Sequence, residues 1–212
     1  MKTNDLINAI AEDAAASLPS VGMRVAVALS IGGAVAAALF MYALGVRPDV
    51  ASALQTWRFD AKLVTTLLCS VAALWATARL ARPDADQRQA LAVLLLPLLA
   101  LAFAIGWELT VSPSATWSAQ AIGSNSRLCV TSLLAMSIAP LVAVLVALRG
   151  GAPRSPGLAG GFAGLLAGGL AATLYAIHCP DDSPLFVALW YMPTVVSIAI
   201  GAALIGHRAL RW

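Results

Sequence analysis

The chain has 212 residues, of which 60% are hydrophobic and only 11% are charged, and its mean hydropathy is +0.86. Soluble domains carry about 25% charged residues, so this composition excludes a water-soluble globular enzyme and predicts a small polytopic membrane protein. The net charge of +3 fits Lys and Arg residues in loops rather than a nucleic-acid-binding surface.

Residues 1–22 form a polar tail that lacks the apolar core of a signal peptide. Thr3 or Asn4 can cap a helix that runs to Leu18. The predicted helix has an apolar stripe with acidic flanks, and its candidate partner-binding residues are Leu6, Ile7, Ile10, Asp5, Glu12 and Asp13. Anionic lipid would repel this acidic tail, whereas an apolar groove on a basic partner would accept it. A frayed tail, or a helix folded onto its own loops, is the alternative.

Six windows of membrane-spanning length follow within residues 23–212. The predicted spans cover residues 25–46, 61–78, 89–107, 128–148, 157–179 and 183–206. Lys62 bounds the second window, and its aliphatic stem can snorkel to the interface. Between the bounding charges there is no Asp, Glu, Lys or Arg, which argues against an ion pump or a proton-coupled transporter. The predicted fold class is all-α, a polytopic bundle of six transmembrane helices.

Lys and Arg are distributed unevenly between the two sides of this bundle. Nine of the 13 fall on the side that holds the N-terminal tail, the second and fourth loops and the C-terminus. Because basic residues collect on the cytoplasmic side, both termini are predicted to be cytoplasmic.

Sequence signatures of catalysis are missing from the chain: there is no HExxH, no P-loop and no Ser–Lys pairing on a helix, so we expect no enzymatic activity. The fifth span instead carries small residues at helical spacing, Gly157 with Gly161, and Gly160 with Gly164 and Gly168. Such faces let helix backbones approach closely. Tight packing within the chain is the favoured interpretation, and a homodimer through this face is the other.

Two cysteines mark the predicted outer face. Cys129 opens the fourth span and Cys179 ends the fifth, at heights of about 29 and 32 Å above the loop that joins these helices. The candidate sensor residues are Cys129, Cys179, His178, Asp181 and Asp182. Thiolate and imidazole ligands from Cys129, Cys179 and His178 would suit a transient Zn or Cu ion, although no cofactor is certain. A structural disulfide, a sensor pair and unrelated thiols all stay open, and Cys69 in mid-span is expected to be an apolar filler.

Several stretches resemble one known family. They are Met1–Lys2–Thr3–Asn4–Asp5–Leu6–Ile7, Cys129, the run from His178 to Phe186, and Trp190–Tyr191. Together with six spans, they resemble the NrsF-type negative regulators of ECF sigma factors over essentially the whole chain. The resemblance implies an anti-sigma factor of the bacterial inner (cytoplasmic) membrane. Its tail would hold an ECF sigma factor away from RNA polymerase until an outer signal releases it.

The two outer cysteines of that family map onto Cys129 and Cys179, for which the resemblance implies sensing of metal or oxidative stress. We expect a change at this pair to repack the fourth and fifth spans and to loosen the inner sigma site. The implied partners are an ECF sigma factor and the lipid bilayer, with no direct contact to nucleic acid. The alternative is a small transport accessory or channel subunit, for which the tail would be dispensable.

Overall fold

The computed structural model describes Thr3 and residues 20–211, and within them the chain is helical without a strand. The predicted partner-binding residues Asp5, Leu6, Ile7, Ile10, Glu12 and Asp13 lie outside the described residues. The long helices are α2 (Val21–Ala43), α4 (Trp57–Leu80), α5 (Gln87–Ala92) with α6 (Leu95–Val111), α8 (Ser126–Leu148), α9 (Pro156–Ala176), and α10 (Pro184–Phe186) with the π-helical turn η2 (Val187–Tyr191) and α11 (Met192–Ala209). Short elements α3 (Val50–Ala53), η1 (Ser114–Thr116) and α7 (Trp117–Ile122) lie in the connections.

Six of these segments are long and apolar enough to cross a membrane, which confirms the predicted all-α bundle of six spans. The first helix ends earlier than predicted, at Ala43 instead of residue 46. Gly45 adopts a left-handed φ of 71°, and its N–H, like that of Leu44, donates to the carbonyl of Phe40. This turn stops the helix because it satisfies a carbonyl at the helix end.

Several spans extend past the charges that bounded them in the sequence, and in two of them a bounding charge becomes buried. Helix α4 begins at Trp57 and therefore includes Lys62, and α6 continues to Val111 and includes Glu108. Both side chains are buried, with 1% and 0% of the residue exposed, respectively. The expectation of helices free of charge, with Lys62 snorkelling to the interface, is therefore wrong at this end of α4 and α6.

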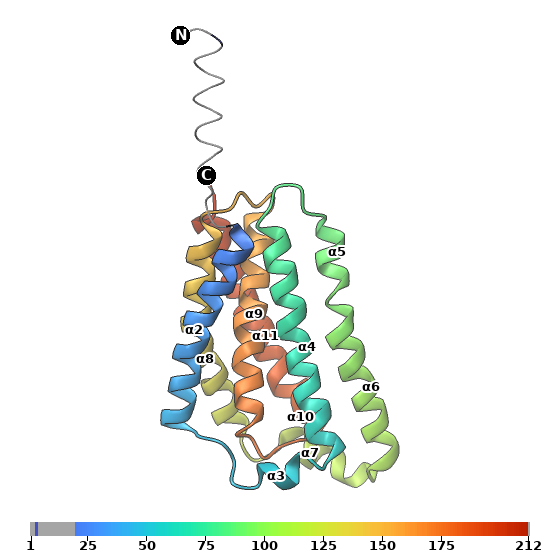
Figure 1. Ribbon diagram of the computed structural model, residues 1–212. Coiled ribbons are helices and arrows are strands. Elements are labelled where there is room, and N and C mark those ends of the chain that lie inside the picture. Colours follow the sequence, from blue (N-terminus) through green and yellow to red (C-terminus); the bar gives the residue numbers. More distant parts are fainter. Residues whose placement is uncertain (1–2, 4–19, 212) are drawn as a thin grey trace.

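Helix α9 is the centre of the bundle. It packs against α4, α8 and α11, while α2 lies on α8 and α6 lies at the edge against α4 (Figure 1). A Cβ atom at Gly160 would lie 2.5 Å from the carbonyl oxygen of Ala202 in α11, and one at Gly164 would lie 2.7 Å from Cα of Ala199. The glycine face of α9 is thus covered by α11 within the chain, and it is not open to the homodimer that the sequence left as an alternative.

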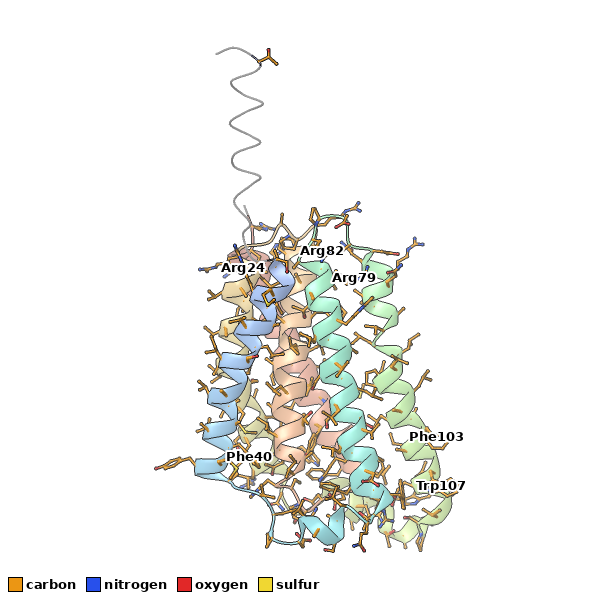
Figure 2. All side chains as sticks on the ribbon, in the orientation of Figure 1. Arg24, Phe40, Arg79, Arg82, Phe103 and Trp107 are labelled. Atoms are coloured by element: carbon orange, nitrogen blue, oxygen red, sulfur yellow. The ribbon has the colours of Figure 1, made fainter. Side chains whose placement is uncertain are left out.

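The chain enters at Ser20 and leaves at Arg211 on the same end of the bundle, here called the terminal end (Figure 1). Arg24, Arg79 and Arg82 lie near this end, while Phe103 and Trp107 lie toward the opposite or distal end (Figure 2). At the terminal end the N–H of Ala152 donates to the carbonyl of Ala81, which ties the α8–α9 loop to the end of α4 at 3.3 Å. The distal end holds the predicted thiol pair.

Candidate functional site

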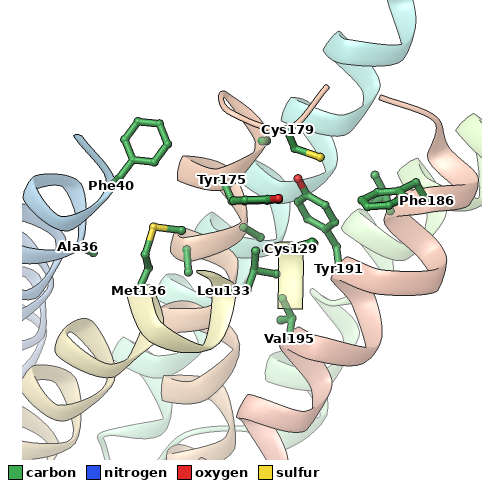
Figure 3. Close-up of a cluster of buried hydrophobic side chains, with 14 of the residues drawn as sticks. Ala36, Phe40, Cys129, Leu133, Met136, Tyr175, Cys179, Phe186, Tyr191 and Val195 are labelled. Carbon is green, nitrogen blue, oxygen red and sulfur yellow. The ribbon is translucent and has the colours of Figure 1, made fainter. Parts of the chain in front are cut away.

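Cys129 and Cys179 lie in one buried cluster at the distal end. Cys129 occupies the first turn of α8, Cys179 follows the end of α9, and both are 0% exposed. We define the thiol cluster as these two residues with their buried neighbours Tyr175, Phe186 and Tyr191 (Figure 3). Each of these cysteines is a free thiol, and so is Cys69. The structure therefore gathers the predicted pair in one buried cluster.

Two phenols face the thiol of Cys179. The rings of Tyr175 and Tyr191 stand 5.9 Å apart between centroids, and both hydroxyls are buried with no hydrogen-bond partner among the described residues. In Figure 3 the Cys179 sulfur and these hydroxyls point toward one another. Burial in this apolar site raises the pKa of the Cys179 thiol above its usual value. The closed site thus keeps Cys179 as a neutral thiol, which is a weak nucleophile and a weak metal ligand.

The segment that carries Cys179 is held by two cations. Lys62 donates from Nζ to the carbonyl of Cys179 at 2.8 Å and to Oδ1 of Asp182 at 2.5 Å. Arg47 donates from Nη1 to the other oxygen of Asp182 at 2.8 Å and to the same carbonyl at 3.3 Å. Asp182 therefore bridges a lysine of α4 and an arginine of the α2–α3 connection.

Arg47 is also held by Asp49, through two hydrogen bonds of 2.8 and 2.7 Å. This forked contact, followed by the contact to Asp182, outweighs burial and raises the pKa of the Arg47 guanidinium. The same contact lowers the pKa of Asp49. Both groups stay charged, so Arg47 remains a cation beside Asp182.

The remaining predicted sensor residues have structural partners of their own. Nδ1 of His178 lies 3.0 Å from the carbonyl of Gly45. Both oxygens of Asp181 accept from the N–H of Ser124, and one also accepts from the N–H of Asn125, which fastens the start of α8. Among the described residues no three His, Cys, Asp or Glu side chains are placed to hold a metal ion. The Zn or Cu set of Cys129, Cys179 and His178 therefore does not fit this closed arrangement.

A second ion pair joins α4 to α6. Arg58 donates from Nε and Nη2 to the two oxygens of Glu108, both at 2.8 Å, and Ser112 donates to the same carboxylate at 2.6 Å. The guanidinium also lies over the ring of Trp57. Since three donors satisfy it, the fully buried carboxylate is stable within a spanning helix.

A polar cavity of about 580 Å³ lies beside the residues that follow Cys179. Its lining residues are Gln55, Thr56, Trp57, Arg58, Gln120, Pro180, Asp181, Asp182 and Ser183. Asp182 thus lines the polar cavity and also contacts the buried Lys62.

Comparison with known proteins places the chain in a family. The family model described as negative regulator of sigma F, NrsF, matches residues 10–212. The chain belongs to this NrsF family. It is 35% identical to the anti-sigma-F factor NrsF of Caulobacter vibrioides over 214 residues and 34% identical to the probable anti-sigma-F factor NrsF of Azospira oryzae over 213, covering each chain completely. No solved structure matches it.

Sequence reasoning found the thiols of this NrsF-family chain but missed the cations around them. Arg58 and Lys62 are four residues apart, so they share one face of α4. Two cations at helical spacing beside an apolar run can indicate that their face of the helix packs against the rest of the protein. Their acidic partners lie 50 and 120 residues away, and no local pattern joins residues at such separations.

Proposed function

We propose that this chain is an anti-sigma factor that spans the bacterial inner membrane and sequesters an ECF sigma factor at its cytoplasmic face. The observation that carries the proposal is the match to the negative regulators of sigma F, which covers nearly the whole chain. Six helices of membrane-spanning length support the location. The regulatory role of the family supports a function without catalysis, and a transport accessory has no observation in its favour.

The sigma-binding end, in this proposal, is the terminal end of the bundle. The tail leads directly into α2 there, and Arg24, Arg79 and Arg82 are at the same end (Figure 2). Basic residues favour the cytoplasmic side, where a sigma factor is found. The apolar stripe of the tail then supplies the contact.

The distal end, facing the oxidising side of the membrane, would receive the signal. The thiol cluster supports a redox sensor because two free thiols share one buried site. Oxidation by a peroxide would join the two sulfurs. The two thiols would lose two electrons and two protons. These would reduce the peroxide and break its O–O bond, which for hydrogen peroxide gives two molecules of water. A disulfide requires Cα atoms about 4.4–6.8 Å apart and a defined geometry. We expect its formation to repack α8 and α9 and to loosen the sigma-binding end.

The test combines binding and release in native membranes. Full-length protein is captured and the associated cytoplasmic protein is identified by mass, and a sigma factor is expected. A Cys129→Ser, Cys179→Ser double variant should still capture it but should no longer release it after treatment with peroxide. Cys69→Ser is the matched control and should release sigma normally. Capture without any sigma factor contradicts the anti-sigma role, and normal release by the double variant contradicts the thiol sensor.

A further inference from the structure

Lys62 is a buried cation within a spanning helix. Its side chain is 0% exposed, near the start of α4. Ionisable residues inside membrane spans are costly, and they usually have a function. Apolar residues of similar volume often replace a buried ion pair without loss of stability. We therefore expect Lys62 to have a function beyond packing.

The partners of Lys62 lie in the segment that carries a sensor thiol. Its ammonium holds the carbonyl of Cys179 and the carboxylate of Asp182, three residues further along. Lys62 also lies over the ring of Phe59 on its own helix, with Nζ 5.4 Å from the ring centroid. Contact with Lys62 thus fixes the Cys179 segment at two points against one turn of α4.

This contact joins a residue that lines a cavity to a buried side chain. Asp182 and its neighbours Pro180 and Asp181 line the polar cavity of about 580 Å³. Beyond the contact, Cys129 and Cys179 are 0% exposed among apolar and aromatic side chains. A polar reagent that enters the cavity therefore reaches Asp182, whereas neither Cys129 nor Cys179 lines the cavity.

We propose that Lys62 and Asp182 form a latch that controls access from the distal face to Cys179, with Lys62 as the positioning residue. The Asp182 carboxylate satisfies the ammonium and holds the segment closed. If this carboxylate is removed, as in Asp182→Asn, Lys62 is a buried charge without its acid, and the open state that lets it reach water is favoured. The inference deepens the proposed function, because it names what controls the sensor, but its test needs no sigma factor.

The experiment measures thiol access in the full-length reduced protein, held in lipid nanodiscs. A water-soluble methanethiosulfonate with a quaternary ammonium group is added. A cysteine thiolate attacks its sulfenyl sulfur, a mixed disulfide forms and a sulfinate leaves. Mass spectrometry quantifies the label on Cys69, Cys129 and Cys179 separately. Asp182→Asn is expected to label at Cys179 at least about tenfold faster than the native chain, which corresponds to about 1.4 kcal/mol.

Two variants isolate the contribution of Lys62. Asp49→Asn removes the other carboxylate on Arg47, which does not bond to Lys62, and should label at Cys179 within about twofold of the native rate. The double variant Lys62→Met, Asp182→Leu removes both charges and should restore slow labelling, because no uncompensated charge is left in the apolar site.

Three results would overturn the latch. One is an unchanged Cys179 rate in Asp182→Asn. Another is equal acceleration in Asp49→Asn, which would assign the effect to Arg47. The third is acceleration of Cys69 in parallel with Cys179, which would mean general loosening of the bundle. If labelling follows the expectation while the double serine variant still releases sigma, the latch stands and the thiol-sensor proposal falls.

Discussion

The two ion pairs at the distal end differ in which partner is buried: the acid in one pair and the base in the other. In the pair of Arg58 with Glu108, the carboxylate side chain is 0% exposed and the guanidinium side chain 39%. In the pair of Lys62 with Asp182, the ammonium is 0% exposed and the carboxylate 16%. Removing the exposed partner leaves a buried charge behind, whereas removing the buried partner leaves a charge that water can solvate. The two members of each pair are therefore not equivalent.

The Arg58–Glu108 ion pair between α4 and α6 allows this difference between the buried and the exposed partner to be measured. Arg58→Gln leaves the buried Glu108 without its cation and should destabilise the protein by about 3–5 kcal/mol. Glu108→Gln leaves a partly exposed guanidinium and should cost about 1–3 kcal/mol. Thermal unfolding of both variants in one detergent gives the comparison.

The control for this pair is Asp60→Asn, an exposed acid on the same helix. It should change stability by no more than about 0.5 kcal/mol. Equal losses in Arg58→Gln and Glu108→Gln would show that exposure of the partner does not set the cost.

At the scale of elements, the contact of α9 with α11 depends on missing side chains. Gly160 lies against the backbone of Gly206, where an added Cβ would be 2.9 Å from Cα. Gly161, one residue on, has only ordinary contacts, the nearest 3.5 Å from Cβ of Ala203. Adjacent glycines of one helix thus meet very different surroundings.

Alanine substitutions should separate these two glycines. Gly160→Ala pushes α11 away and should destabilise the bundle by about 1–3 kcal/mol. Gly161→Ala should be neutral or should stabilise by about 0.4–1 kcal/mol, since it reduces the freedom of the unfolded chain. Chemical unfolding in mixed micelles measures both, and a loss in Gly161→Ala as large as in Gly160→Ala would contradict the packing argument.

The six spans were predictable because hydrocarbon length and bounding charges are local features of the sequence. Which helices pack against one another was harder to predict from the sequence. Gly160 and Gly164 indicated a close contact, but their spacing could not choose between α11 and a second copy. The sequence places Lys62 at the interface, because no local pattern indicates its contact with Asp182, which is 120 residues away. Long-range pairing decides which charges can be buried, and it appears only when the helices are assembled.

At the scale of the whole molecule, the bundle has two chemically distinct ends. The terminal end carries Arg24, Arg79 and Arg82 (Figure 2). The distal end carries the thiol cluster and both buried ion pairs. The base asymmetry predicts the orientation of the bundle in the membrane. Reporter fusions at residues 1 and 212 should both be active as cytoplasmic fusions, and one inserted after Thr116 should be active only as an outer one. A cytoplasmic signal from the Thr116 fusion would reverse the proposed direction of signalling.

The apolar stripe of the tail predicts how substitutions there change the affinity for the sigma factor. Burying a leucine side chain contributes about 1.5–3 kcal/mol, so Leu6→Asp should weaken sigma binding by more than about tenfold. Asn8→Asp adds the same charge off the apolar stripe and should bind almost normally. Titration of purified full-length protein with the captured sigma factor measures both variants. Equal affinity of Leu6→Asp and the native chain would remove the apolar stripe from the interface.

Helix α4 is fastened at each end to a different part of the chain. Near its start Lys62 holds the Cys179 segment, and just past its end the Ala81 carbonyl holds the loop between α8 and α9. A single inserted residue between these points would rotate one end by about 100° and lift it by about 1.5 Å relative to the other. Only one of the two attachments could then be kept. The span from residue 62 to residue 81 is therefore a fixed length, and insertions and deletions in relatives should be confined to the connections outside it.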